Sequence, residues 1–325
     1  MVKNSQPSAP VINVVLGQNA THEPTRGPRY HELVYNITVK KTAATAGFAS
    51  ATVAEALERV LVLVNDNEVR EVLTSELDQI HTRWADGLKI VAYDGIGNDL
   101  ITAVPDVVVD ANTTRTTTFV VPIYFAEPSR STFTDRELFA WPTAWASGRT
   151  AKLQVKLKLA ATAGFSAPEI SAREAIDWVL GPVVNGKDIM PATAWKRMEE
   201  GYTGVAMAIR KWPFTGILQQ FSVFSPTGAS DDVNAMKITS GKTVVFDGSK
   251  HDLERLLDRN QWNNAAGAKS AHRIDYAFDF SDNPSDGQPL DDVTLFETKL
   301  TLAAAAGGNK TQVVLVQVYQ DLLSK

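Results

Sequence analysis

The chain contains no cysteine among its 325 residues. A disulfide framework and a thiolate zinc site are therefore both excluded. Long hydrophobic runs are missing too: the apolar stretches are short and interrupted, so no segment is expected to cross a bilayer. The residues from Met1 to Gly17 lack the apolar core of a signal peptide. We therefore expect a soluble protein that is made in the cytoplasm.

Basic residues are slightly fewer than acidic residues. Lysine and arginine number 32 against 37 aspartate and glutamate residues, which gives a net charge of −5 at pH 7. The basic residues form no stripe of the kind that neutralises a long run of nucleic-acid phosphates. We therefore predict no direct binding to nucleic acid.

Two partial motifs for ligand binding fail on inspection. The run Ser240–Thr243 contains Gly-Lys-Thr, but Met236 stands where a phosphate-binding loop needs its first glycine. The acidic loop Asp279–Gly287 resembles a calcium loop, but Pro284 and Val293 occupy positions that require oxygen ligands. A solvated loop is the favoured interpretation, with calcium bridging between subunits left open.

Catalytic signatures are absent as well. No serine lies in a nucleophile-elbow motif. No two histidines have the spacing of a helical metal site, although the chain has five of them: His22, His31, His81, His251 and His272. We predict no catalytic residue and no cofactor, and the sequence assigns no metal ligand.

The stretch 60–84 organises the rest of the chain. It begins with the apolar run 60–64 and the polar turn 65–67, and apolar residues then recur at spacings of three and four from Val69 to Trp84. This pattern predicts a strand, a turn and an amphipathic helix. The stretch 243–262 repeats the order, with a strand at 244–246, a turn at 247–248 and a helix.

Ser249 and Asp252 have the spacing of a capping box, which marks the start of that second helix. Trp84 and Trp262 stand at matching ends of the two helices and are interpreted as packing anchors. His81 lies on the first helix and is interpreted as scaffolding. The repeat indicates one fold that is built twice.

Alternating or β-branched runs predict strands elsewhere, in the same order in both halves. These runs lie at 30–41, 88–92, 107–109, 116–125, 151–159, 216–224, 273–280, 293–302 and 311–319. The prediction is a mainly β chain of two tandem eight-stranded jelly rolls, each with an inserted helix, joined by a partly helical linker. The expected domains are an N-terminal arm at 1–29, a first jelly roll at 30–163, a linker with short helices at 164–213 and a second jelly roll at 214–325.

The linker and the arm carry their own local signals. A capping-box pattern at Ser166–Glu169 predicts a helix that ends near Leu180, and a second helix is expected at 192–200. Four prolines interrupt the arm, although 11–16 has the composition of a short strand. An arm on a neighbouring subunit and a frayed terminus are equally compatible with this pattern.

Several of these segments, taken in order, resemble the double jelly-roll major capsid proteins of tailless, icosahedral bacterial viruses that contain an internal membrane, of the corticovirus kind and its freshwater relatives. The resemblance covers Tyr30 to Tyr319. It is carried by Val62–Asn67, Ile123–Pro128, Lys152–Leu159, Ala192–Met198 and Phe246–Lys250, followed by Leu253, Leu256 and Leu257.

The resemblance implies a structural protein of the virion capsid. Members of this group form homotrimers, and the six jelly rolls of a trimer make a pseudo-hexagonal capsomer. Neighbouring capsomers, penton and minor capsid proteins and the internal viral membrane are the implied partners. Some members are associated with calcium, but the resemblance assigns no ligand residue here.

A carbohydrate-binding or carbohydrate-cleaving tandem jelly roll, such as a receptor-binding spike, is the alternative. It predicts a concave aromatic patch with convergent carboxylates. Trp141, Trp145 and Trp178 offer aromatic surface, but packing in the core or in an interface is the favoured interpretation. The matched halves favour the capsid prediction, because a glycan enzyme tends to concentrate aromatic and acidic residues in one half.

Overall fold

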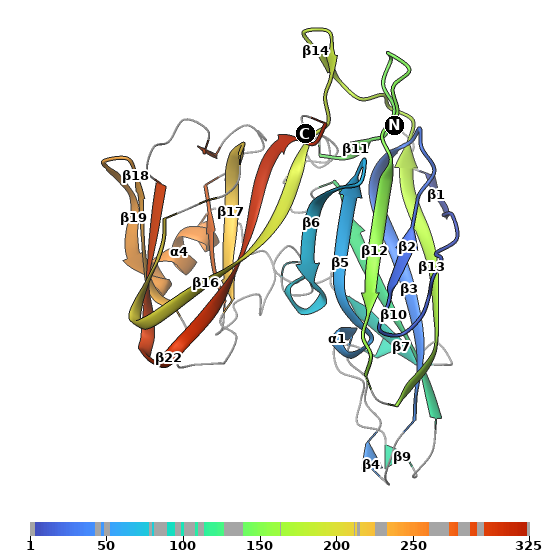
Figure 1. Cartoon of the computed structure of the whole chain (residues 1–325), viewed down its shortest axis with the longest axis horizontal. Helices are drawn as coiled ribbons and strands as arrows, with labels where there is room; N and C mark the ends of the chain where they lie inside the picture. The colour runs from blue at the N-terminus through green and yellow to red at the C-terminus, as the bar shows by residue number, and fades with distance from the viewer. Residues whose placement is uncertain are drawn as a thin grey trace. The chain divides into compact units, whose positions relative to one another are not determined.

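The chain folds into two compact units, one made of residues 1–190 and 322–325 and the other of residues 191–321. The computed structural model describes residues 4–42, 47–48, 53–77, 80, 90–94, 99–100, 108–109, 114–126, 139–162, 164–210, 212, 215–224, 233–259, 273–278, 287–290 and 296–323. Strands make up most of this part of the chain (Figure 1).

The first unit is an antiparallel sandwich. Its elements are β1 (Asn4–Pro7), β2 (Asn19–His22), β3 (Arg29–Thr42), β4 (Gly47–Phe48), α1 (Val53–Ala56), β5 (Leu57–Val64), β6 (Asn67–Leu73), β7 (Val91–Asp94), β8 (Asp99–Leu100), β9 (Val108–Val109), β10 (Thr114–Tyr124), β11 (Trp141–Pro142), β12 (Leu153–Leu159), β13 (Phe165–Asp177), β14 (Val183–Val184) and β15 (Lys187–Asp188). One sheet has the order β1-β13-β3-β10-β7-β8, with β11 beside β3, and the other contains the run β6-β5-β12-β2.

Strand β3 shows why these residues form a half-buried sheet. Its alternate residues Leu33, Tyr35, Ile37 and Val39 are completely buried, while the residues between them are only partly covered. Strand β12 buries Leu153, Val155, Leu157 and Leu159 in the same way. The strands predicted at 30–41, 116–125 and 151–159 are thereby confirmed, because period-two patterning buries one face of each strand.

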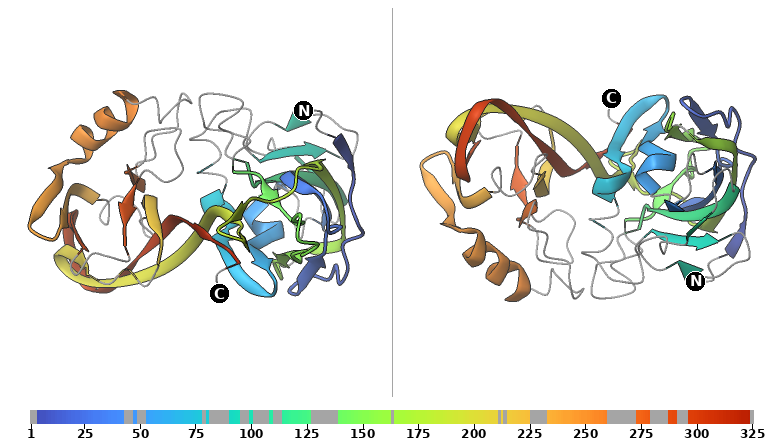
Figure 2. Two further views of the ribbon diagram at one scale, coloured as in Figure 1. Left: turned by 90° about the horizontal axis from the view of Figure 1, so that it is seen from above. Right: turned by 90° about the horizontal axis from the view of Figure 1, so that it is seen from below.

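The second unit is built around two long strands. Its elements are β16 (Pro191–Ile209), β17 (Ile217–Phe224), β18 (Val233–Ser240), β19 (Thr243–Ser249), α4 (Lys250–Arg259), β20 (Arg273–Ala277), β21 (Gln288–Pro289) and β22 (Phe296–Asp321). Figure 2 shows β16 and β22 curving together through this unit. The first part of β22 pairs with β18 and its last part pairs with β17. The two strands predicted at 293–302 and 311–319 are thus parts of one long strand.

The core of the second unit gathers apolar residues from nearly all of these strands and from α4. Phe221 and Leu253 are completely buried in it, and Trp212 packs against Phe221 and Phe296 with ring centroids 5.3 and 5.4 Å apart. No helix in the described ranges is long and apolar enough to cross a membrane.

The helix predicted from Val69 onward is wrong at its start. Asn65 and Asp66 both have positive φ angles, 49° and 67°, which is the geometry of a tight type I′ hairpin turn. The chain therefore returns as β6, antiparallel to β5, and helical residues begin only at Thr74. The spacing of Val69 and Val72 fits a helix, but both residues are buried in a strand. His81 and Trp84 lie outside the described residues.

The second copy shows the same order of hairpin and helix. Its turn is at Gly241 and Lys242, so the turn predicted at 247–248 is wrong, and those residues belong to β19. The capping box is confirmed, because the Ser249 amide donates to the Asp252 carboxylate at 2.9 Å and the Asp252 amide donates to the Ser249 hydroxyl at 3.2 Å. Trp262 is outside the described ranges.

The helices predicted in the linker are wrong. Residues 165–177 form β13, which pairs with β3 along most of its length, and residues 191–209 form β16, which pairs with β22. The capping-box pattern at Ser166–Glu169 is instead an irregularity in β13, where Ala167 has a positive φ of 46°. Pairing with distant strands therefore outweighs the local helix signals, which are weak by comparison.

The N-terminal arm is part of the first unit in the described structure. Strand β1 pairs with β13 in one sheet and β2 pairs with β12 in the other, so residues 4–22, called the strap below, join both sheets along one side. The short strand expected at 11–16 is reduced to one bridge between Ile12 and Thr21. Neither an arm on a neighbouring subunit nor a frayed terminus describes these residues.

Candidate functional site

Two polar networks, one buried and one partly buried, hold the first unit together where its terminal segments meet. They were not predicted, because their members lie up to 168 residues apart in the chain. Within the described residues, no three histidine, cysteine, aspartate or glutamate side chains gather as a metal site would require. These two networks are therefore the candidate functional sites of the first unit.

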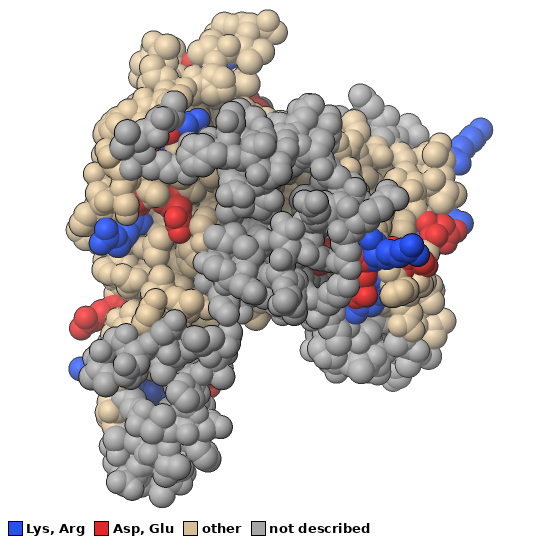
Figure 3. Space-filling view, turned by 180° about the vertical axis from the view of Figure 1, so that it is seen from behind, with Lys and Arg blue, Asp and Glu red and all other residues tan. Residues whose placement is uncertain are grey.

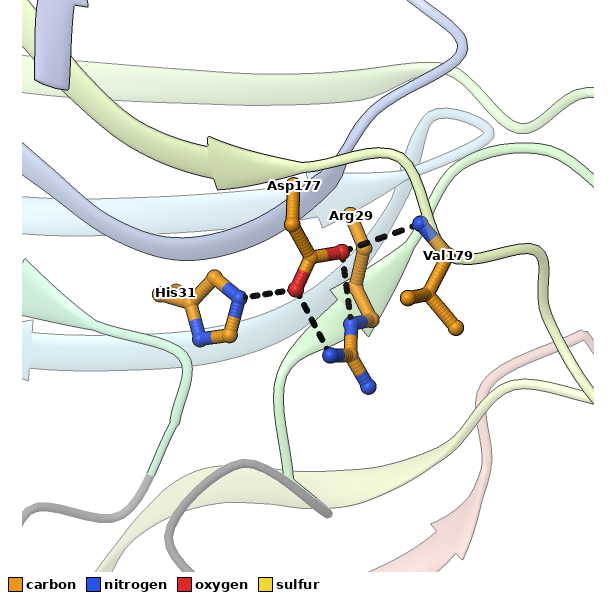
Figure 4. A network of polar contacts seen from close by, with 4 residues as sticks. All are labelled: Arg29, His31, Asp177 and Val179. Carbon is orange, nitrogen blue, oxygen red and sulfur yellow. Dashed lines mark hydrogen bonds and ion pairs between the residues drawn. The ribbon is translucent and has the colours of Figure 1, made fainter. Parts of the chain in front are cut away.

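The first network is centred on Asp177, the last residue of β13 (Figure 4). Its carboxylate accepts hydrogen bonds from Arg29 Nε at 3.1 Å and Arg29 Nη2 at 2.7 Å, and from His31 Nε2 at 2.7 Å. The Val179 amide donates a fourth hydrogen bond at 3.0 Å. The Asp177 side chain is only 2% exposed, so these donors replace the water it would otherwise bind.

Burial and hydrogen bonding act on the Asp177 carboxyl in opposite directions. Desolvation raises its pKa, but the donors Arg29, Val179 and His31 together lower it to about 2. The residue is therefore ionised at neutral pH and fixes Arg29 in a bidentate pair. The network fastens the start of β3 to the end of β13, where the chain leaves the sandwich.

The second network fastens the strap. Glu174 accepts hydrogen bonds from Gln6 Nε2 at 2.8 Å and from the Ser8 hydroxyl at 2.6 Å. Ser8 Oγ lies 3.1 Å from His22 Nε2, and His22 Nδ1 lies 2.8 Å from the Tyr35 hydroxyl. One chain of contacts thus runs from β1, through the strap, to the buried face of β3.

Ser8, His22 and Glu174 contain the residue types of a nucleophilic triad, but their order is wrong for catalysis. Burial lowers the pKa of His22 to about 4, partly opposed by a hydrogen bond with the Ala9 backbone, so the ring is neutral at pH 7. Burial also raises the pKa of Tyr35, so its hydroxyl stays protonated at pH 7. Ser8 has a single hydroxyl proton and directs it to the Glu174 carboxylate, so Ser8 can only accept a hydrogen bond from His22. The proton of His22 therefore sits on Nε2 and points at Ser8.

Ser8 in turn donates its own proton to Glu174. His22 cannot accept a proton from Ser8 in this arrangement, whereas a serine nucleophile needs its histidine as a base. The network therefore has a structural role: it joins the strap to both sheets of the first unit.

A buried arginine also packs inside the same unit. Arg70 of β6 is 2% exposed and donates to the Tyr124 carbonyl at 2.6 Å. Its guanidinium lies 4.6 Å from the Trp141 ring centroid and 5.8 Å from that of Phe125. These contacts stabilise a buried arginine through cation–π interactions. Trp141 and Trp145 are both buried, which confirms packing and leaves neither ring free to stack on a sugar.

The segment after β13 is fastened in a similar way. The Trp145 indole donates to the Ile189 carbonyl at 2.9 Å, and Gly181 lies directly against the indole ring. Trp178, which precedes Gly181 in the chain, is 65% exposed. It therefore differs from Trp141 and Trp145, which are buried.

The remaining predicted features have no site around them. Gly241 and Lys242 form the tip of the β18–β19 hairpin, which is unlike the strand-to-helix turn of a phosphate-binding loop. His251 is exposed on α4, and His272 and the acidic loop at 279–286 lie outside the described residues.

Surface charges are arranged in pairs. Lys152 lies 2.9 Å from Asp66 and 3.1 Å from Glu23, and Arg210 lies 2.7 Å from Glu297. On the face shown in Figure 3, basic and acidic side chains of the described residues lie in small, separate groups. This arrangement is unlike the continuous basic surface that a long nucleic-acid footprint requires.

Comparison with known proteins agrees with this reading of the fold. No family model and no curated protein sequence matches the chain. Solved structures do match it: the major capsid protein P2 of bacteriophage PM2 superposes with a TM-score of 0.68 at 12% identity, over 98% of each chain. The fold is a double jelly roll. The predicted fold class is thereby confirmed.

Two further structures extend the likeness. The major capsid protein of Sulfolobus Turreted Icosahedral Virus matches with a TM-score of 0.66 at 12% identity, over 98% of this chain and 96% of that one. A chain of the PBCV-1 virus capsid matches with a TM-score of 0.64 at 12% identity, over 98% and 93%. The likeness therefore covers both jelly rolls and the connection between them.

Proposed function

We propose that the chain is the major capsid protein of an icosahedral virus, with a structural, non-enzymatic role in the virion. The observation that carries this proposal is the match over 98% of the chain to capsid proteins of nearly equal length. A match that omitted one roll would fit many proteins, but two rolls in tandem over the full length fit a shell subunit.

The polar networks support a structural role. Arg29, His31, Asp177 and Glu174 use their polar groups in hydrogen bonds that join strands of the first unit to one another. The carbohydrate alternative is weakened for the same reason, because Trp141 and Trp145 lie in the core. We therefore do not propose it.

The assembly that we propose is a homotrimer. Three chains with two similar rolls each close a ring of near-sixfold symmetry, which suits hexagonal packing in a shell. Neighbouring capsomers, penton and minor capsid proteins and an internal membrane are the partners that this proposal includes.

Light scattering of the purified native protein tests the proposal. We expect a mass three times that of the chain, and ring-shaped particles by negative-stain electron microscopy. A strict monomer at every accessible concentration would contradict the proposal, as would specific binding or cleavage of a glycan.

A further inference from the structure

Strand β19 forms an open edge of the second unit. It pairs with β18 on one side and ends the strand order β19-β18-β22-β16 (Figure 1). Among the described residues, no strand pairs with its other side. In an antiparallel edge strand the backbone groups of alternate residues face away from the paired neighbour. Val244 and Val245 of this seven-residue strand are 49% and 39% exposed.

Three other sheet edges in the described structure are protected. Strand β1 has four residues and ends in a proline, β2 is covered by the bridge between Ile12 and Thr21, and β8 has two residues. Short strands, proline and covering segments are the usual means by which proteins prevent pairing between sheet edges. Strand β19 is longer and contains no proline. Its one charged residue, Asp247, is paired with Lys237 at 2.8 Å.

The edge is also held rigidly. Phe246 packs against Tyr276 with ring centroids 5.4 Å apart, and α4 begins directly after the strand at the Ser249 cap. Leu253 of α4 is completely buried in the core of the unit. A strand that is already ordered loses little conformational entropy when it binds a partner.

We propose that the open edge of β19 binds a strand of a second copy of this chain. The inference rests on the proposed function, since a shell built from one chain brings many copies together. Backbone hydrogen bonds would supply the affinity, and burial of Val244 and Val245 would add to it. Residues 243–246 carry no charge, which suits contact between copies that each have a net charge of −5 and therefore repel one another.

The test compares two valine-to-lysine variants of the full chain. Val244→Lys places a charge at the proposed contact, and Val205→Lys places one on β16 at a valine that is also 49% exposed. Mass is measured by light scattering over a concentration series, with circular dichroism as the check on folding. We expect Val244→Lys to raise the dissociation concentration by about tenfold or more, equivalent to about 1.4 kcal/mol. Val205→Lys should assemble like the wild type.

Hydrogen exchange of the wild type supplies a second measurement that needs no variant. The amides of residues 243–249 should exchange more slowly in the assembled state than in the dissociated chain. Equal exchange in both states, or assembly of Val244→Lys at wild-type concentrations, would overturn the inference and leave the proposed function standing. A wild type that is monomeric at every concentration would instead overturn the proposed function.

Discussion

Replacing Asp177 by asparagine is the sharpest test of how the first unit is held together. The asparagine keeps the size of the side chain but removes the charge that accepts hydrogen bonds from Arg29 and His31. Lowering the Asp177 pKa from 3.8 to about 2 corresponds to roughly 2–3 kcal/mol of preferential stabilisation of the ionised form. We expect the variant to lose about that much free energy of unfolding at pH 7.

The pH dependence of the loss is part of the prediction. The folded-state pKa of Asp177 lies below its unfolded value, so its contribution is complete above pH 4 and disappears as the pH falls toward 2. The difference between wild type and Asp177→Asn should therefore shrink over that interval. Comparing two proteins at each pH cancels the titration of the other carboxyl groups.

The assay is urea unfolding at fixed protein concentration, monitored by tryptophan fluorescence, because assembly makes stability depend on concentration. Asp66→Asn is the matched control in the same unit, since Asp66 is exposed and pairs with Lys152 at the surface. It should shift the midpoint far less than Asp177→Asn does. Equal midpoints for the wild type and Asp177→Asn at pH 7 would refute the reasoning.

Three further substitutions test other parts of the structure. The pKa of His22 is about 4 in the folded protein, below its unfolded value of 6.5. The free energy of unfolding of the wild type should therefore fall by roughly 2–3 kcal/mol between pH 6.5 and pH 4. The urea midpoint of His22→Gln should lack that loss. Gly181→Ala would place a methyl group against the Trp145 indole, and a loss of about 1–3 kcal/mol with a shifted tryptophan emission is expected; unchanged emission would argue against that contact. Ser249→Ala removes the cap of α4 and should cost about 1 kcal/mol, seen as faster amide exchange in the first turn of the helix, whereas unchanged exchange would show that the cap contributes little.

Local sequence patterns were sufficient to predict the elements that bury one face. The alternation in β3 and β12 predicted their strands, because a strand that faces a core on one side must alternate. The capping box at Ser249 and Asp252 predicted the start of α4, because both hydrogen-bond partners lie within one turn. Absence of cysteine likewise excluded disulfides without any structure.

Local sequence patterns predicted the wrong type of element where a segment pairs with a strand that is distant in the chain. Helices were predicted for parts of β13 and β16, yet both segments pair along their length with β3 and β22. The helix predicted from Val69 failed because Asn65 and Asp66 form a tight hairpin turn, and the apolar spacing in β6 fits two kinds of element. The strap was predicted to be an arm. Its prolines and polar residues do not indicate which strands the segment will pair with.

The sequence by itself determined that the chain is mainly β, is built as two similar halves and lacks disulfide chemistry, because composition and short-range periodicity carry that information. Only the tertiary structure decided that Ser8 and Gln6 reach Glu174 and that Asp177 accepts hydrogen bonds from Arg29 and His31. It also decided that, among the described strands, β19 lies at the edge of its sheet. These features depend on pairing between residues far apart in the chain. Such pairing is selected by burial and hydrogen bonding of the whole fold, which no local pattern records.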